Sequence, residues 1–189
     1  MLIIYDFISY TDVFTYNITT LESLLIYAMK TITYQSDYLG NGFEFATINQ
    51  PDDYEGKVVA TVIRKQCSMP SNKAVLYVHG FNDYFFQSDM AHRFNEKEYH
   101  FYAIDLRKYG RSTLPHHKSN NMRSLTEYFA DLDEALEIIR QEGNEQVLLS
   151  GHSTGGLLVT LYASERVGNE KFDTIFCNSP FYDMNMPGY

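Results

Sequence analysis

The segment QVLLSGHSTGG, residues 146–156, is the most informative part of this chain. It opens with residues 147–149, a short apolar run of the kind found in strands that are buried on both faces of a parallel sheet. Residues 151–155 then fit the pattern G-x-S-x-G, which is typical of a tight turn that lifts a nucleophilic serine out of a sheet. A helix-compatible run follows at 156–166. The segment therefore predicts strand, turn and helix, with Ser153 as the candidate nucleophile.

Two glycines of this pattern have a steric reason to be there. Strand and helix pack closely on either side of such a serine, so the residues two positions before and after it have no room for a Cβ atom. Gly151 and Gly155 occupy these positions. We therefore expect both glycines to be structural parts of the turn.

Composition restricts the possible functions. The chain has 189 residues, of which 44% are hydrophobic, so it can bury the core of one domain. A formal net charge of -9 argues against a nucleic acid or an anionic membrane as partner. Cys67 and Cys177 lie far apart and show no metal-type spacing, so we expect no metal, no cofactor and reduced thiols in a cytoplasmic protein.

The first 28 residues differ from the rest because they contain no Lys or Arg. A secretory signal needs a positive start, and Asp6, Asp12 and Glu22 interrupt every window long enough for a membrane span. We expect neither export nor membrane insertion. Translation starting at Met29 would make residues 1–28 an extension upstream of a domain at 29–189. The alternative is an ordinary N-terminal helix at about 21–29, and the sequence leaves both open.

On either side of the central segment, strand-like and helix-like stretches alternate, which predicts an α/β fold with a mostly parallel sheet and helices on both faces. An antiparallel entry pair at 43–48 and 58–63 is separated by a turn at 50–53. The other expected strands are 74–78, 100–104 and 174–177, and the expected helices are 83–94 and 125–140.

Four pieces of sequence resemble one known family in the same order. They are His79-Gly80, DLRKYGRS at 105–112, the amphipathic segment 125–140 and GHSTGG at 151–156. Together they resemble the N-terminal part of an α/β-hydrolase, in the serine hydrolase group of lysophospholipases, monoacylglycerol lipases and proline-iminopeptidase-like enzymes. The match spans roughly residues 43–183. It implies the α/β-hydrolase fold and serine-dependent hydrolysis, but it does not identify the substrate.

The resemblance also assigns an oxyanion hole. When a serine oxygen attacks an ester, the former carbonyl oxygen becomes negative and must meet donors that already point at it. The family places these donors at the backbone amides of Phe81 and Thr154. Losing one such donor typically costs about 3 kcal/mol in the barrier. His79 and Gly80 are then structural parts of the loop, and Asp105 is expected to organise the loop that follows it.

The base and the acid are missing from their usual places. In this fold the order is nucleophile, acid, histidine, yet all six histidines precede Ser153. Asp183 is a candidate acid, and His116 or His117 could approach from a loop. The simplest hypothesis is truncation after the sixth strand, with the acid and the histidine expected beyond Tyr189.

The sequence thus predicts a serine carboxylic-ester hydrolase, similar to a lysophospholipase or monoacylglycerol lipase, that acts on a small ester or monoacyl lipid through an acyl-serine. The alternatives are a non-catalytic fragment of the same fold and a peptidase of the same group. Truncation would leave the strand at 174–177 as an apolar sheet edge, so self-association is also expected.

Overall fold

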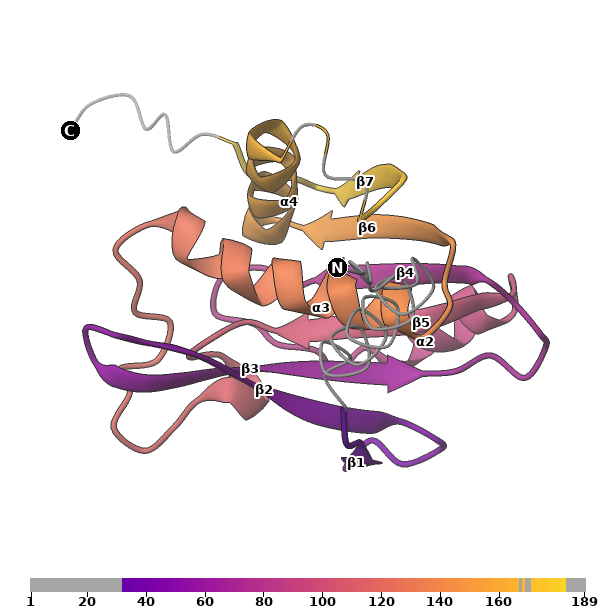
Figure 1. Cartoon of the computed structure of the whole chain (residues 1–189), viewed down its shortest axis with the longest axis horizontal. Coiled ribbons are helices and arrows are strands. Elements are labelled where there is room, and N and C mark those ends of the chain that lie inside the picture. Colours follow the sequence, from indigo (N-terminus) through magenta and orange to yellow (C-terminus); the bar gives the residue numbers. More distant parts are fainter. Residues whose placement is uncertain (1–31, 167, 169–170, 183–189) are drawn as a thin grey trace, which may run out of the picture. The chain divides into compact units, whose positions relative to one another are not determined.

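The computed structural model describes residues 32–166, 168 and 171–182, and the chain divides into two compact units, residues 1–32 and 33–189. The expected extension at 1–28 lies outside the described residues. The second unit is built on a seven-stranded sheet with the order β1-β2-β3-β5-β4-β6-β7 (Figure 1). The strands are β1 Gln35–Ser36, β2 Glu44–Asp53, β3 Gly56–Lys65, β4 Lys73–Val78, β5 Tyr99–Asp105, β6 Gln146–His152 and β7 Thr174–Asn178.

The sheet has an antiparallel half and a parallel half. Strands β1, β2 and β3 pair antiparallel, and β3 also runs antiparallel to β5. Strands β5, β4, β6 and β7 are all parallel to one another. The predicted α/β-hydrolase architecture is confirmed as a mixed sheet, and β1 is a short strand that the sequence pattern did not indicate.

The turn of the entry hairpin lies later than predicted. Strand β2 continues through Pro51 to Asp53, and the turn is at residues 54–55. Pairing is irregular between Gln50 and Asp53, where the missing N–H of Pro51 is tolerated. The turn is then closed by Asp53, whose Oδ1 accepts from the Glu55 amide at 2.7 Å. The prediction of a turn at 50–53 was wrong because proline occupies a bulge there.

Helices cover both faces of the sheet, as predicted. Val75 and Tyr77 of β4 join an aromatic cluster with Phe85 and Phe101 beneath α2, Ser88–Asn95. Leu76 alternates with them and is fully buried on the opposite face, where α3, Phe129–Gln141, and α4, Thr154–Glu165, lie. The two helices on that face meet at Phe129 and Tyr162, whose ring centroids are 5.3 Å apart. Among the described residues, no helix has both the length and the apolar character needed to cross a bilayer.

Helix α2 is shorter than the segment 83–94 that was expected. The Phe85 amide donates to Asp105 Oδ1 at 2.8 Å, and its ring is fully buried in the core. Because this amide is held by a side chain of β5, residues 83–87 do not join the helix, which begins at Ser88.

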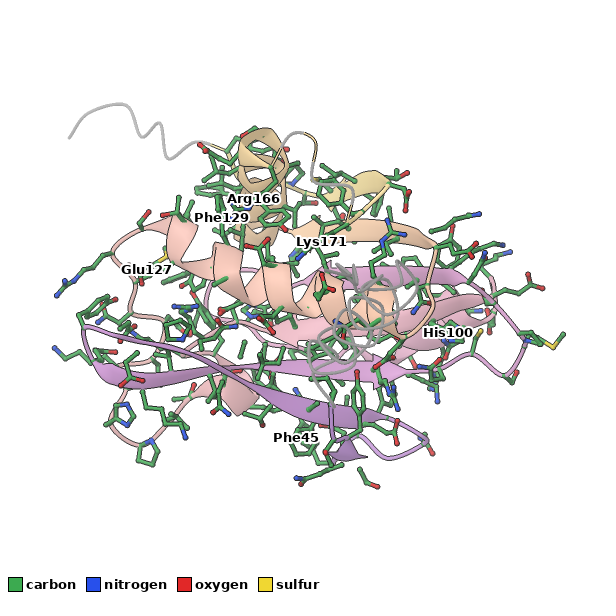
Figure 2. All side chains as sticks on the ribbon, viewed as in Figure 1. Phe45, His100, Glu127, Phe129, Arg166 and Lys171 are labelled. Atoms are coloured by element: carbon green, nitrogen blue, oxygen red, sulfur yellow. The ribbon has the colours of Figure 1, made fainter. Side chains whose placement is uncertain are left out.

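The segment predicted to be helical at 125–140 is helical throughout, but its first turn differs. It begins with the 3₁₀ turn η2, Leu125–Tyr128, and continues as α3. A capping box formed by Ser124 and Glu127 closes the start, with the Ser124 amide donating to Glu127 Oε1 at 3.1 Å. Figure 2 shows Glu127 at this end of the segment and Arg166 close to Phe129.

Candidate active site

The backbone at Ser153 is strained. Ser153 stands between the end of β6 and the first residue of α4, with φ 54° and ψ -122°. A side-chain-bearing residue rarely adopts positive φ, and such conformations cost of order 1–3 kcal/mol. They persist at functional sites where the surrounding structure holds them. This is the backbone geometry that the pattern G-x-S-x-G predicts.

The glycines around Ser153 stand where no side chain fits. A Cβ atom on Gly151 would lie 2.4 Å from the Gly155 carbonyl oxygen. A Cβ on Gly155 would lie 2.3 Å from the His79 carbonyl oxygen. Gly80 also approaches closely, since a Cβ there would be 3.2 Å from the Ser153 Cβ. The backbone at the start of α4 is therefore in close contact with the ends of β4 and β6, and Ser153 lies at this contact.

The end of β7 and the segment that follows it hydrogen-bond to the turn. The Ser153 amide donates to the Asn178 carbonyl at 3.2 Å, and the Ser153 carbonyl accepts from the Phe181 amide at 3.0 Å. The same Asn178 carbonyl lies 3.1 Å from His152 Nδ1. Within the described residues the Ser153 hydroxyl makes no hydrogen bond, and the side chain is half-buried. It is therefore accessible for reaction. No sequence pattern indicated these contacts, because they join residues 25 or more positions apart along the chain.

The two expected oxyanion donors lie beside the serine. Phe81 and Thr154 both line a cavity next to the turn, and neither backbone amide donates to an acceptor in the part of the chain that the structure describes. Thr154 is also the first residue of α4, so the positive end of the helix dipole is at this point. The arrangement is suited to a developing negative charge, and the oxyanion role of both amides remains a prediction.

His79 is committed to the backbone. Its ring is buried, with Nδ1 2.8 Å from the Gly80 carbonyl oxygen. Nε2 accepts from the Leu106 amide at 3.2 Å, so the proton is on Nδ1, which donates to Gly80. Burial lowers the pKa of His79, only partly opposed by the bond to Gly80, and keeps the ring neutral. Both nitrogens are occupied, which leaves this histidine unsuited to carry protons for Ser153.

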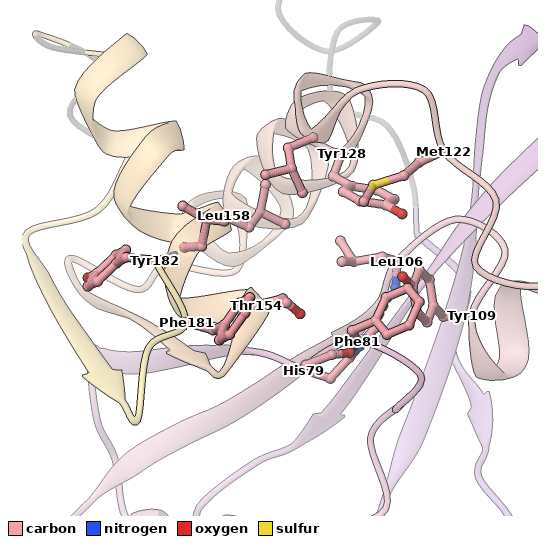
Figure 3. Close-up of a pocket in the computed structure, with 14 residues that line it drawn as sticks. His79, Phe81, Leu106, Tyr109, Met122, Tyr128, Thr154, Leu158, Phe181 and Tyr182 are labelled. Carbon is pink, nitrogen blue, oxygen red and sulfur yellow. Dashed lines mark hydrogen bonds between the residues drawn. The ribbon is translucent and has the colours of Figure 1, made fainter. Parts of the chain in front are cut away.

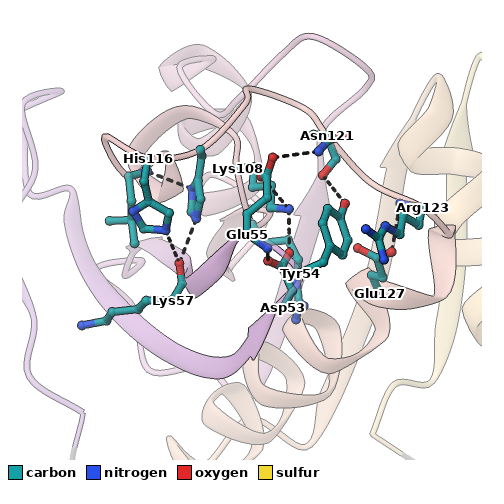
Figure 4. Close-up of polar contacts among 12 residues, drawn as sticks. Asp53, Tyr54, Glu55, Lys57, Lys108, His116, Asn121, Arg123 and Glu127 are labelled. Carbon is teal, nitrogen blue, oxygen red and sulfur yellow. Dashed lines mark hydrogen bonds and ion pairs between the residues drawn. The ribbon is translucent and has the colours of Figure 1, made fainter.

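His116 and His117 are anchored away from the serine. Both rings place Nε2 near the carbonyl oxygen of Lys57, at 3.0 and 2.9 Å, on the antiparallel side of the sheet (Figure 4). His117 Nδ1 accepts from the Leu114 amide at 3.0 Å. In this structure neither histidine contacts Ser153, so the loop does not supply a base here. Asp183, the other candidate, lies outside the described residues.

A buried ion cluster fixes the loop that carries these histidines. Lys108 Nζ is fully buried, 2.6 Å from Asp53 Oδ2 and 2.9 Å from Glu55 Oε2 (Figure 4). It also lies 4.2 Å from the centre of the Tyr54 ring. Burial lowers the pKa of Lys108, but its bonds to the two carboxylates outweigh this and raise the pKa above its ordinary value. The loop after β5 is thereby tied to the turn of the entry hairpin.

Asp105 organises the start of the same loop, as expected. Its fully buried carboxylate accepts from the Phe85 amide, from the Arg111 amide at 2.9 Å and from Arg111 Nη1 at 2.9 Å. Arg111 reaches across to Asp37 as well, with Nε 2.7 Å from Asp37 Oδ2. All of these partners are structural, so Asp105 is not free to act as a catalytic acid.

An apolar cavity of about 390 Å³ opens beside Ser153 (Figure 3). Its lining joins the oxyanion loop and the start of α4 to the loop after β5 and the first turn of η2. The residues are His79, Gly80, Phe81, Leu106, Tyr109, Met122, Leu125, Tyr128, Thr154, Gly155, Leu157, Leu158, Phe181 and Tyr182. Sequence reasoning missed most of this wall. The signal that could have found part of it is the spacing of Leu125 and Tyr128, which puts both on one side of a helical turn.

The described residues provide no evident metal site. No group of three or more His, Cys, Asp or Glu side chains in this part of the chain is placed to hold an ion. The described residues in and beside the cavity offer the Ser153 hydroxyl, the backbone amides of Phe81 and Thr154, and a largely apolar wall.

Comparison with known proteins identifies the family. The family model described as serine aminopeptidase, S33, matches residues 69–188, more than half of the chain. The chain belongs to this family. It is a family of hydrolases with the α/β-hydrolase fold, which confirms the resemblance seen in the sequence. No curated protein matches the chain.

Solved structures show the same fold at low identity. A carboxyl esterase from Bacillus coagulans is 17% identical with TM-score 0.59, over 70% of this chain and 43% of its own. A probable hydrolytic enzyme from Pseudomonas aeruginosa is 17% identical with TM-score 0.58, over 72% of this chain and 41% of its own. Acetyl xylan esterase 1 from Thermoanaerobacterium is 16% identical with TM-score 0.56, over 82% of this chain and 54% of its own. This S33-family chain thus spans about half the length of the structures that it resembles.

Proposed function

We propose that this chain provides the nucleophile and the oxyanion hole of a serine carboxylic-ester hydrolase. The observation that most supports the proposal is the strained Ser153, whose neighbours Gly80, Phe81 and Thr154 line an apolar cavity. In the reaction, Ser153 Oγ attacks the ester carbonyl and the alcohol leaves, forming an acyl-serine. Water then releases the acid. The two amides stabilise the oxyanion in both steps.

The shape and polarity of the cavity support a monoacyl lipid or a similar small ester as substrate. An apolar wall that contains Leu106, Met122 and Leu158 accepts hydrocarbon and offers little to a charged group. This lysophospholipase-like or monoacylglycerol-lipase-like specificity is the finer part of the proposal. The family description favours a second candidate, a peptidase that releases an amino-terminal residue, because the matching model is that of a serine aminopeptidase.

The nucleophile is tested by covalent labelling with a fluorophosphonate probe, followed by mass spectrometry of the modified peptide. We expect labelling at Ser153 and its loss in Ser153→Ala. Ser164 is an exposed serine on α4 and provides the matched control. The variant Ser164→Ala should label like the parent chain. In the described residues no histidine hydrogen-bonds to the Ser153 hydroxyl, so we expect slow turnover, in which Ser153 attacks without a general base and the two amides stabilise the oxyanion.

The outcomes separate the candidates. Hydrolysis of a short p-nitrophenyl ester that depends on Ser153 supports the esterase, whereas preferential cleavage of an aminoacyl p-nitroanilide supports the peptidase. A folded chain that is neither labelled nor active would contradict both, and would support the third hypothesis, a non-catalytic scaffold of the same fold.

We propose that copies of the chain associate through the edge strand β7. It pairs with β6 on one side only among the described strands, and Phe176 on it is 54% exposed. Exposed apolar edges pair readily with other chains. We expect the sedimentation coefficient to rise with protein concentration, and Phe176→Lys to abolish the rise. Met69→Lys, which changes an exposed apolar residue away from the edge, should leave it intact. A parent chain that stays monomeric at all concentrations would refute this.

A further inference from the structure

The exposed part of the oxyanion loop, residues 81–82, is held by a side chain from another loop. The backbone is fixed before this pair by the buried His79 ring and after it by the Phe85 amide, which donates to a carboxylate of β5. Between these points, Phe81 and Asn82 make no backbone hydrogen bond within the described residues, and Phe81 is 60% exposed. Their polar contact in this part of the chain is a bond at 3.0 Å, in which Asn120 Nδ2 donates to Asn82 Oδ1.

Asn120 itself stands on a firmly anchored part of the loop after β5. Its amide donates to the Lys108 carbonyl at 3.1 Å, and the Lys108 side chain is fixed by its two buried ion pairs. The next residue, Asn121, accepts from the Tyr54 hydroxyl at 3.1 Å and donates from Nδ2 to Glu55 Oε1 at 2.8 Å (Figure 4). The backbone that carries the Asn120 side chain is therefore tied to the turn of the entry hairpin, and it provides a fixed support for the oxyanion loop.

The bond between the two asparagines lies beside the cavity but not in its wall. Neither residue lines the cavity, whereas Phe81 and Met122, their neighbours along the chain, both do. Asn82 is exposed and Asn120 is half-buried, so water can replace the bond and its loss should cost the fold little stability. Asn82 also has φ 54°, in the left-handed region where few residues other than glycine and asparagine are found. The bond therefore affects the path of the chain at residues 81–82 more than the stability of the protein.

We propose that Asn120 is a positioning residue, whose hydrogen bond to Asn82 holds the Phe81 amide in the direction that the oxyanion requires. Asn120 acts through the oxyanion loop and does not touch the substrate. A displacement on the order of 1 Å at a reacting group costs about 10²-fold in rate, so a bond that contributes little to stability can still matter for the reaction. The inference rests on the proposed function, in which the Phe81 amide is an oxyanion donor.

The first test is a double-mutant cycle on the kinetics of labelling by an alkyl fluorophosphonate. The variants are Asn82→Gly, Asn120→Gly and the double variant, because glycine suits the left-handed backbone at both positions, with φ 54° and 59°, and removes only the side-chain amide. We expect the limiting rate of labelling to fall about five- to tenfold in each single variant, and no further in the double variant, because all three lose the same bond. The reagent concentration that gives half the limiting rate should stay unchanged, since it reports binding of the alkyl chain in a cavity that neither asparagine lines.

Asn41→Gly is the matched control for these variants. Asn41 lies between β1 and β2, is exposed and has φ 49°, so the same substitution is made in the same backbone conformation away from the cavity. Asn41→Gly should label at the parent rate, and its Tm should be close to that of Asn120→Gly. Equal labelling of Asn41→Gly and Asn120→Gly, or losses that add in the double variant, would overturn the inference.

An NMR relaxation measurement separates failure of the inference from failure of the proposed function, because it needs no reaction. The order parameter of the Phe81 amide should fall in Asn120→Gly, from about 0.85 toward 0.6, while that of the Thr154 amide on α4 stays unchanged. This fall, in a protein whose Ser153 is never labelled, would sustain the positioning role and refute the hydrolase. Labelling of Asn120→Gly at the parent rate with an unchanged order parameter would sustain the hydrolase and refute the role of Asn120. Neither labelling nor a fall would refute both.

Discussion

Replacing Gly155 by alanine is expected to lower the free energy of unfolding by about 4 kcal/mol and to abolish labelling of Ser153. The new Cβ would lie 2.3 Å from the His79 carbonyl oxygen and 2.5 Å from that of Val78. Both obstacles are backbone atoms of the central strand and of the oxyanion loop, so they cannot swing aside as a side chain would. Core overpacking usually lowers the free energy of unfolding by about 1–3 kcal/mol. Because the two carbonyl oxygens cannot move without moving the backbone, we expect Gly155→Ala to lie at the top of that range or above it.

In Gly155→Ala the rate of labelling at Ser153 should also fall, because the same clash displaces the oxyanion donors. To make room, the start of α4 must move away from β4, and this separates the Thr154 amide from the Phe81 amide across the proposed oxyanion hole. A displacement of 1 Å in a reacting group costs on the order of 10²-fold in rate. The measurements are chemical denaturation, for stability, and the rate of fluorophosphonate labelling, for the site.

Gly143→Ala is the control for this substitution. Gly143 has φ 88°, and no atom lies within 4 Å of the position that an alanine methyl group would take, so alanine there suffers backbone strain without a clash. We expect a loss of about 1–2 kcal/mol from the strain and no change in labelling. If Gly155→Ala were no more destabilising than Gly143→Ala and still labelled at the parent rate, the close approach of α4 to β4 would be refuted.

The turn at Ser153 could be predicted from the sequence because its physics is local. Strand, serine and flanking glycines are consecutive, and the lack of space for a Cβ atom follows from the turn itself. The same applies to β4, β5 and β6, the inner strands of the parallel half, whose apolar runs are largely buried and hence easy to recognise. The order of residues along the chain was therefore enough to predict these elements.

Other features could not be predicted because distant residues decide them. Helix α2 begins at Ser88 because Asp105, on the next strand, holds the Phe85 amide. The segment after β7 supports the turn through a bond between Phe181 and Ser153 that joins residues 28 positions apart. In the same way, the cavity becomes visible only when the loop after β5 and η2 come together. A linear pattern carries no information about such pairs.

The loop after β5, which lines the cavity, is held to α3 by one buried carboxylate, and we expect removal of this carboxylate to destabilise the protein strongly. Asp131, on α3, is fully buried and binds Arg107, with Nη2 2.7 Å from Oδ1 and the Arg107 amide 3.0 Å from Oδ2. Burial lowers the pKa of Arg107, but its bonds to Asp131 outweigh this and raise the pKa above its ordinary value. Arginine is in any case not deprotonated in proteins, so the guanidinium stays charged even when its partner is removed.

Asp131→Ala is expected to lower the free energy of unfolding by about 3–5 kcal/mol, because it leaves that charge buried and unpaired. Asp133→Ala on the same helix is the matched control. Asp133 pairs with Arg166 at 2.9 Å with its side chain 28% exposed, and it also accepts from the Tyr162 hydroxyl at 2.7 Å. Its removal should therefore cost about 1–2 kcal/mol, well below the loss expected for Asp131→Ala. Denaturant titration of both variants makes the comparison.

A double variant identifies the cause of the loss. If the unpaired charge is responsible, Arg107→Met combined with Asp131→Leu should recover most of the stability, since apolar residues of similar volume often replace a buried pair at little cost. If instead the two aspartate variants were equally mild, or the double variant were as unstable as Asp131→Ala, the ion pair would not be what anchors α3 to the loop. The Arg107 amide would still lack its acceptor in the double variant, so a residual deficit of about 1 kcal/mol is expected.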